Sequence, residues 1–142
     1  MKNKTTLTVI AVAALASANL AQADTINGSL GTAASATDWY TVNCPTGTAK
    51  AYADIVDTSA ADSVFPSILL SKTGAISTSD NPEGGAASAG VTLSNNNGVY
   101  NIYITHSGAT AAANNYTANV HCQTSTGAHV GGQPAFVTKQ NQ

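Results

Sequence analysis

Arginine is absent from this sequence, and charged residues of every kind are scarce. The chain of 142 residues contains five lysines and seven acidic residues, and only 8% of its residues are charged. Proteins that bind nucleic acids or anionic membranes through charge carry clusters of Lys and Arg, and the sequence has none. The composition therefore argues against nucleic-acid partners. Ala, Ser, Thr, Gly and Asn are plentiful instead, which is typical of a neutral, hydrogen-bonding surface.

Long apolar runs are also missing, apart from one stretch near the start of the chain. Two lysines precede a mostly apolar run over residues 7–16, and Ala21 and Ala23 provide the small residues that a signal peptidase recognises. This order is typical of a secretory signal peptide, and the run is too short for a membrane-spanning helix. We expect residues 1–23 to be removed on export and the protein to be secreted or periplasmic, without membrane insertion.

Cysteine is equally scarce, since Cys44 and Cys122 are the only two. Around each of them apolar and polar residues alternate, with the cysteine in the apolar set. Both sulfurs are therefore expected to face the core from strand ends. In an oxidising compartment pairing is the usual outcome, and we predict one structural disulfide. The alternative is a catalytic or metal-binding thiol, although neither cysteine lies in a CxxC motif.

Helical periodicity is missing as well, because no segment longer than about two turns shows it. Short runs of strand-forming residues are separated by turn residues throughout residues 24–122, which we take as the folded domain. The predicted strands are 25–30, 38–44, 48–56, 66–71, 91–93, 99–105 and 115–122. Residues 73–90 are expected to form a polar loop, and 95–98 a turn. This spacing predicts an all-β fold, an antiparallel β-sandwich of about seven to nine short strands.

Beyond residue 122 the alternation disappears. Residues 123–142 are rich in glycine and polar residues and contain few apolar anchors. A flexible C-terminal tail is the expected structure. The alternative is that Ala135, Phe136 and Val137 add as a strand to a sheet edge of this or another subunit.

The acidic residues gather around two loops, and oxygen ligands spaced along loops suit calcium. The candidate calcium ligands are Asp54, Asp57, Asp62, Asp80, Asn81 and Glu83. Asp and Asn are also common turn residues, which is the alternative explanation. His106, His121 and His129 could instead form a copper or zinc site, although His121 is on the outward phase of its strand and His129 falls in the tail.

Aromatic residues make up only 6% of the chain, which makes their positions informative. Trp39, Tyr52 and Tyr103 are out of phase with the core-facing residues of their strands, so we expect them on outer sheet faces. Exposed aromatic side chains on a flat sheet can serve as a platform for polysaccharides or proteins. Ordinary cross-strand packing is the alternative role for the same residues.

No catalytic constellation is evident in the sequence. A serine nucleophile requires a histidine and a carboxylate, and all three residue types occur, but there is no Gly-x-Ser-x-Gly elbow. His106 follows a predicted strand in a Thr-His-Ser-Gly turn, where a local hydrogen bond is a sufficient role. We expect the protein not to be an enzyme.

The order of the motifs is informative in its own right. They are INGSL at 26–30, DWY at 38–40, Gly47, ILL at 68–70, DN at 80–81, GVYNIYI at 98–104 and YTANV at 116–120. In this order they resemble the Gly-x-Leu strand, Asp-x-Tyr strand, turn glycine, central apolar strand, acidic loop, Gly-x-Tyr strand and closing strand of the bacterial pre-peptidase C-terminal domain family. The resemblance implies a β-sandwich of jelly-roll type. It also implies a non-catalytic accessory module of exported enzymes, some of whose relatives bind calcium or a polymer such as collagen or chitin.

These observations predict a single exported β-sandwich that binds a polymer or a protein outside the inner membrane. Two alternatives remain. One is an extracellular structural protein that self-associates through strand edges or its tail, and the other is a small hydrolase. We expect a monomer.

Overall fold

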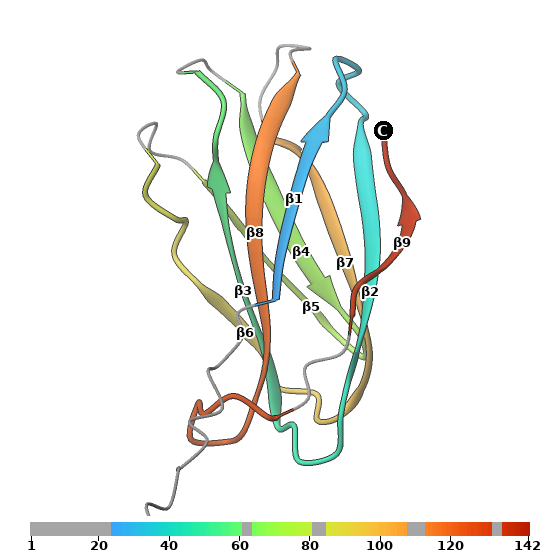
Figure 1. Cartoon of the computed structure of the whole chain (residues 1–142), viewed down its shortest axis with the longest axis vertical. Coiled ribbons are helices and arrows are strands. Elements are labelled where there is room, and N and C mark those ends of the chain that lie inside the picture. Colours follow the sequence, from blue (N-terminus) through green and yellow to red (C-terminus); the bar gives the residue numbers. More distant parts are fainter. Residues whose placement is uncertain (1–23, 61–63, 81–84, 108–112, 132–134) are drawn as a thin grey trace, which may run out of the picture.

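Two layers of antiparallel strands make up the structure of this chain. The computed structural model describes residues 24–60, 64–80, 85–107, 113–131 and 135–142, and these ranges contain nine strands and no helix. The strands are β1 (Asp24–Leu30), β2 (Thr37–Cys44), β3 (Lys50–Asp57), β4 (Phe65–Ser71), β5 (Ala75–Ser79), β6 (Val91–Leu93), β7 (Gly98–Ser107), β8 (Asn114–Gln123) and β9 (Val137–Gln140). They pack face to face as two sheets (Figure 1), so the predicted antiparallel β-sandwich is confirmed. None of the described residues belongs to a helix that could cross a membrane.

The strand order is that of a jelly roll. A four-stranded sheet has the order β1-β8-β3-β6, a five-stranded sheet has the order β5-β4-β7-β2-β9, and all neighbours are antiparallel. Successive strands lie in opposite sheets, with the β4–β5 hairpin as the exception. Eight strands that cross between two sheets in this way form a jelly roll, to which β9 adds an edge.

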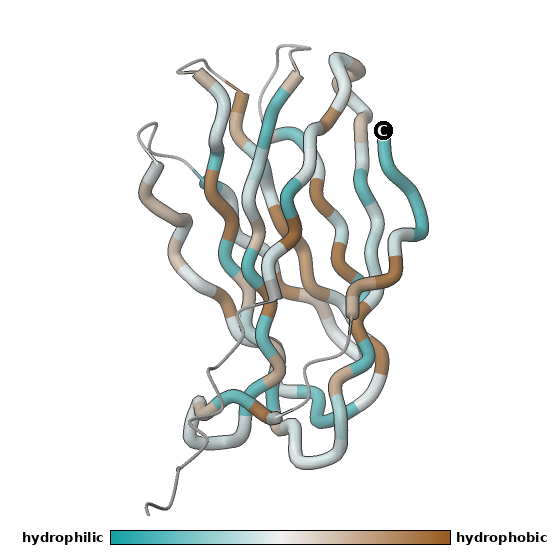
Figure 2. The backbone as a smooth tube through the Cα atoms, viewed as in Figure 1, coloured by the Kyte–Doolittle hydropathy of each residue, from teal (hydrophilic) through white to brown (hydrophobic). Residues whose placement is uncertain are grey.

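Period-two alternation along each strand builds the core between the sheets. In Figure 2 apolar and polar residues alternate along most strands. On β3, for example, Ala51, Ala53 and Ile55 are fully buried, whereas the residues between them are half-buried on the outer face. Burying one Ile or Leu side chain stabilises the fold by about 1.5–3 kcal/mol. The larger fully buried apolar side chains are Leu30, Val42, Ile55, Val64, Ile68, Leu70, Ile102, Ile104 and Val120.

A disulfide crosses the core near one end of the sandwich. Cys44 ends β2 in the five-stranded sheet, and Cys122 lies near the end of β8 in the four-stranded sheet. Their Cα atoms are 5.6 Å apart and both residues are buried. The predicted disulfide is therefore confirmed, and it is consistent with an oxidising compartment outside the cytoplasm.

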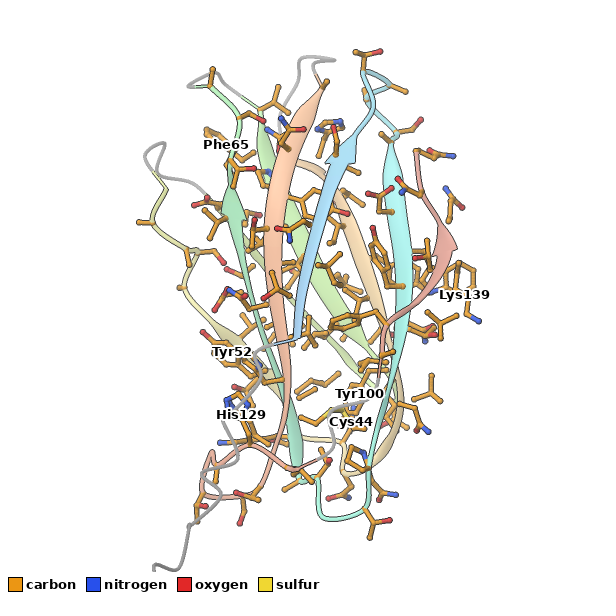
Figure 3. All side chains as sticks on the ribbon, viewed as in Figure 1. Cys44, Tyr52, Phe65, Tyr100, His129 and Lys139 are labelled. Carbon is orange, nitrogen blue, oxygen red and sulfur yellow. A yellow bond between two sulfur atoms is a disulfide. The ribbon has the colours of Figure 1, made fainter. Side chains whose placement is uncertain are left out.

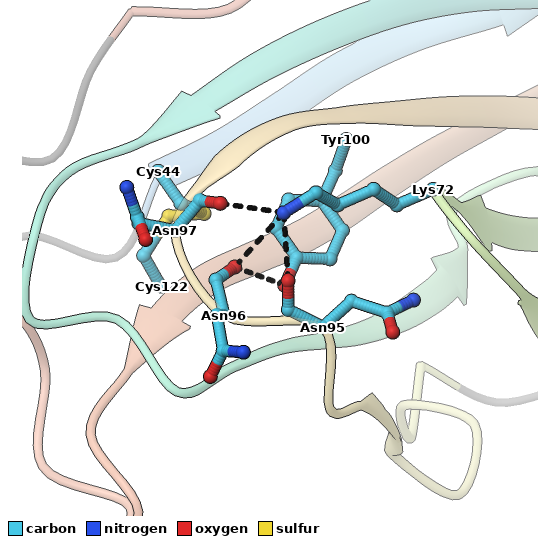
Figure 4. Close-up of a disulfide and its surroundings, with 7 residues drawn as sticks. All are labelled: Cys44, Lys72, Asn95, Asn96, Asn97, Tyr100 and Cys122. Carbon is cyan, nitrogen blue, oxygen red and sulfur yellow. Dashed lines mark hydrogen bonds between the residues drawn. A yellow bond between two sulfur atoms is a disulfide. The ribbon is translucent and has the colours of Figure 1, made fainter.

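Close to this disulfide, the turn between β6 and β7 wraps around one lysine (Figure 4). Lys72 Nζ donates hydrogen bonds to three backbone carbonyl oxygens of the turn, those of Asn95, Asn96 and Asn97, at 2.6, 3.4 and 2.5 Å. It also lies 5.0 Å from the centroid of the Tyr100 ring. Asn96 adopts a positive φ of 55° within this turn, in agreement with the expected Asn-rich turn over 95–98. These hydrogen bonds tie the turn to Lys72, the residue that follows β4.

Replacing both Cys44 and Cys122 by Ala should lower the free energy of unfolding by about 4 kcal/mol. The bridge closes a long loop, since the cysteines are 78 residues apart, and it restricts the unfolded chain accordingly. Urea unfolding of the oxidised protein and of the double variant measures the difference. A loss below about 1 kcal/mol would contradict an important role for this bridge.

A buried hydrogen-bond network also crosses between the sheets. Asp38 on β2 is fully buried, and its Oδ2 accepts a 2.6 Å hydrogen bond from the hydroxyl of Tyr116 on β8. The Tyr40 and Tyr116 hydroxyls are 3.0 Å apart. The backbone N–H of Gln142 donates a 2.8 Å hydrogen bond to Asp38 Oδ1. The backbone N–H of Gly31 in turn donates to the backbone oxygen of Gln142. Burial, followed by the hydrogen bond to Asp38, raises the pKa of Tyr116 far above its usual value.

This network predicts a loss of stability at alkaline pH. Tyrosines of the unfolded chain ionise near pH 10, whereas the folded protein keeps Tyr116 neutral. The contribution of Tyr116 to the free energy of unfolding is therefore complete below about pH 10 and declines above it. Urea unfolding between about pH 9 and pH 11 should show that decline. In Tyr116→Phe the decline of the unfolding free energy with pH should be shallower. At neutral pH this variant should be less stable by about 1–3 kcal/mol, because Asp38 loses a hydrogen-bond donor. Equal slopes for both proteins would contradict this account.

Two segments differ from the expectations drawn from the sequence. Residues 75–79, expected within a polar loop, form the edge strand β5 beside β4. Residues 137–140, expected within a flexible tail, form β9 on the edge of β2, where Val137 faces Thr41. Of the two interpretations of the tail, strand addition within the chain itself is observed, but the strand is Val137–Gln140, so Ala135 and Phe136 precede it and only Val137 of the three expected residues belongs to it. The folded domain therefore extends beyond residue 122, and β8 itself ends at Gln123.

Deleting residues 135–142 should destabilise the protein and promote self-association. The deletion removes β9 from the β2 edge and the Gln142 N–H from buried Asp38. An unpaired strand edge recruits other chains. Calorimetry should show a lower melting temperature, and size-exclusion chromatography should show oligomers. A truncated chain that remains monomeric and melts like the full chain would contradict the role given to β9.

Candidate functional site

A row of large side chains crosses the outer face of the five-stranded sheet. Trp39 on β2 lies opposite Tyr103 on β7, and Tyr103 lies opposite Leu69 on β4. All three are half-buried. The Trp39 and Tyr103 rings stack with their centroids 5.8 Å apart and their planes inclined by 22°. We refer to Trp39, Tyr103 and Leu69 as the aromatic row.

The aromatic row is held in place by one polar contact and surrounded by uncharged residues. Trp39 Nε1 donates a 3.2 Å hydrogen bond to Asn101 Oδ1 on β7, which fixes the indole ring. The outward positions of β2, β4, β5 and β7 that flank the row carry no formal charge. They are Thr37, Thr41, Asn43, Phe65, Ser67, Ser71, Ala75, Ser77, Ser79, Val99, Asn101 and Thr105. This sheet face therefore combines aromatic rings with hydroxyl and amide groups and lacks charged side chains at these positions.

Tyr52, the third aromatic residue predicted for a ligand platform, lies on the opposite side of the sandwich. It belongs to β3 in the four-stranded sheet, where its ring stacks on that of His121 at 5.8 Å. Its hydroxyl donates a 2.9 Å hydrogen bond to Asp54 Oδ2. The structure therefore brings Trp39 and Tyr103 together and excludes Tyr52 from their surface.

Two of the three histidines meet near Tyr52, since the His121 ring contacts those of both Tyr52 and His129, and Figure 3 shows His129 close to Tyr52. The rings of His121 and His129 lie 4.5 Å apart and tilted by 49°, and the Nδ1 atoms of both are buried without a hydrogen-bond partner. Burial, followed by the neighbouring His129, lowers the pKa of His121, which is 8% exposed. His106 lies elsewhere, with its Nε2 2.8 Å from the carbonyl oxygen of Gly31, which is 75 residues away in the sequence, so this hydrogen bond is not the local one expected within its turn. The hypothetical site of three histidines is not assembled.

Asp54 is separated from the other acidic residues proposed as calcium ligands. It lies on the outer face of β3, where its Oδ2 accepts from Tyr52 and its Oδ1 accepts from Asn119 Nδ2 at 2.7 Å. Both carboxylate oxygens are thus engaged by side chains of its own sheet.

Asp57 and Asp80, which the sequence assigns to two different loops, are brought together and buried. The Asp57 backbone N–H donates to Asp80 Oδ2, and Asn114 Nδ2 donates to Asp57 Oδ2 at 2.9 Å. Sequence analysis did not identify Asn114, because only the fold reveals that the start of β8 reaches this position. Asp62, Asn81 and Glu83 lie outside the described residues. Within the described ranges no group of three or more His, Cys, Asp or Glu side chains is placed to share a metal ion.

The chain matches no protein-family model, no curated protein and no solved structure.

Proposed function

We propose that the protein is an exported, non-catalytic module that binds an uncharged polysaccharide through the aromatic row. The observation that carries this proposal is the register that stacks Trp39 against Tyr103 on an outer sheet face whose flanking positions on β2, β4, β5 and β7 are uncharged. Half-buried aromatic rings are costly to display on a surface unless they pack or bind, and Trp and Tyr are enriched where proteins bind ligands.

The chemistry of the surface favours a carbohydrate. Sugar rings present apolar C–H faces and a rim of hydroxyl groups, which suit aromatic rings and Ser, Thr and Asn side chains respectively. Neighbouring strands lie about 4.8 Å apart, so the aromatic row spans about 10 Å from β2 to β4. A linear polymer lying across the strands could contact Trp39, Tyr103 and Leu69 in succession. The outward positions of β2, β4, β5 and β7 carry no cationic side chain that would favour an acidic polymer, and the exposed Lys139 lies on β9 at the edge of the sheet next to β2.

Export and an accessory role are supported by independent features. Residues 1–23 have the pattern of a signal peptide, and the disulfide between Cys44 and Cys122 suits an oxidising compartment. The ordered motifs resemble those of the pre-peptidase C-terminal domain family, and the jelly-roll order of the strands accords with that resemblance.

Self-association through the tail is less well supported. That alternative required residues 135–137 to add to the sheet edge of a neighbour. Val137 instead begins β9, which pairs with β2 of its own chain. A small hydrolase has no supporting observation, because His106 is engaged by the Gly31 carbonyl oxygen.

Binding to polysaccharides tests the proposal, with cellulose, chitin and a soluble neutral glucan as probes. We expect the protein to be retained by at least one of them, and Trp39→Ala and Tyr103→Ala each to weaken binding about tenfold, or about 1.4 kcal/mol. Tyr52→Ala is the matched control, because it removes an aromatic ring from the opposite sheet face. Melting temperatures verify that all three variants fold.

Two outcomes would contradict the proposal. One is the absence of binding to every polysaccharide tested. The other is an equal loss of binding in Tyr52→Ala and in Trp39→Ala, which would place the ligand away from the aromatic row.

A further inference from the structure

Three strand ends converge on a buried polar cluster near the end of the sandwich opposite the disulfide. β3 ends at Asp57, β5 ends immediately before Asp80, and β8 begins with Asn114. The exposed fractions of these side chains are 6%, 1% and 0%. The cluster joins both sheets, because β3 and β8 belong to the four-stranded sheet and β5 to the five-stranded sheet (Figure 1).

Most polar atoms of the cluster are satisfied by protein groups. Asp57 Oδ1 accepts from the Ser59 N–H at 2.7 Å, and its Oδ2 accepts from Asn114 Nδ2. Asn114 Nδ2 also donates to the Val64 carbonyl oxygen at 3.0 Å, so both amide hydrogens are used and the orientation of the amide is determined. Asp80 Oδ2 accepts from the Asp57 N–H.

Two oxygens of the cluster remain without a donor. Asp80 Oδ1 and Asn114 Oδ1 are buried and have no hydrogen-bond partner. A buried acceptor without a partner is destabilising, and a buried carboxylate more so unless it is paired or binds a metal. The groups that donate to Asp57 and Asp80 are backbone N–H groups and one amide, and no lysine or histidine is among them. Among the described residues the cluster therefore has two aspartate side chains, two oxygens without a donor and no cationic donor.

We propose that Asp80 Oδ1 and Asn114 Oδ1 bind calcium, with Asp57 orienting the Asn114 amide and contributing its charge. Calcium prefers carboxylate and amide oxygens and accepts water for the rest of its coordination shell. An ion here would balance the buried charge, satisfy both free oxygens and tie the end of β5 to the start of β8. This site does not depend on the aromatic row, so either inference can fail without the other.

Asp54 provides a matched comparison within the same chain. It carries the same side chain as Asp80 and belongs to the same predicted set of calcium ligands. Its two oxygens are already engaged by Tyr52 and Asn119 on the outer face of β3. A calcium site at the buried cluster should therefore require Asp80 and be indifferent to Asp54.

Calcium titration of the disulfide-bonded protein, freed of metal with a chelator, tests this site. We expect heat of binding by calorimetry and a melting temperature that rises with calcium concentration. Asp80→Asn should weaken calcium binding about tenfold or more, while Asp54→Asn should bind like the parent protein. Asn can still accept the Asp57 N–H, so Asp80→Asn is expected to fold. Terbium luminescence, competed by calcium, reports binding in the unsubstituted protein without any variant.

The proposal would be overturned by either of two results. In the first, the parent protein shows no heat, no rise in melting temperature and no terbium binding at millimolar concentrations, which means that water alone satisfies the two oxygens. In the second, calcium binds equally well to Asp80→Asn and to the parent protein, which places the ion elsewhere.

Discussion

A disulfide and buried hydrogen bonds between opposite sheets keep the two layers of this sandwich face to face, and they determine which residues each sheet presents on its outer face. Near one end Cys44 is joined to Cys122, and further along β2 the buried Asp38 accepts from Tyr116. Near the opposite end the β3 backbone donates to Asp80, which follows β5. Each contact links the four-stranded sheet to the five-stranded sheet. A shift of one residue in any strand would turn its core residues outward and destroy these contacts.

Because side chains alternate between the two faces of each strand, the residues that point into the core determine which residues point outward, and the two outer faces differ in chemistry. The four-stranded sheet presents polar side chains that bond to one another, since Thr25, Asn119, Asp54 and Tyr52 form a continuous chain of hydrogen bonds. The five-stranded sheet presents the aromatic row among uncharged outward residues of β2, β4, β5 and β7, with Lys139 on the β9 edge. On the four-stranded sheet these polar groups already form hydrogen bonds with one another. On the five-stranded sheet, Trp39 makes one side-chain hydrogen bond, to Asn101. This asymmetry is the reason for assigning the ligand to the five-stranded sheet.

Much of the fold could be predicted from the sequence because its central strands are amphipathic with period two. Cys44 and Cys122 fall in the apolar phase of their strands, and their pairing followed from that phase together with the compartment. The edge strands were missed for a physical reason. Every residue of β9 is exposed, Val137 by 51%, so β9 leaves no apolar alternation to detect. β5 likewise presents small polar residues along an edge and buries none of them completely.

The candidate sites show where sequence reasoning ends. The outward phase of Trp39, Tyr52 and Tyr103 could be read from alternation, but phase does not say which sheet a strand joins. Only the jelly-roll order separates Tyr52 from the other two. The same crossing connections bring together Asp57 and Asp80 from loops 23 residues apart. They also add Asn114, which no motif marks.

Trp39 is the only tryptophan of the chain and belongs to the aromatic row, so its fluorescence reports directly on the proposed binding surface. The decisive measurement is a fluorescence titration of the intact protein with a soluble neutral polysaccharide. A ligand that covers Trp39 removes water from the indole ring, and the account predicts a saturable shift or quenching of its emission. Unchanged emission at polymer concentrations that demonstrably retain the protein would mean that the ligand binds another surface, and this would contradict the central claim.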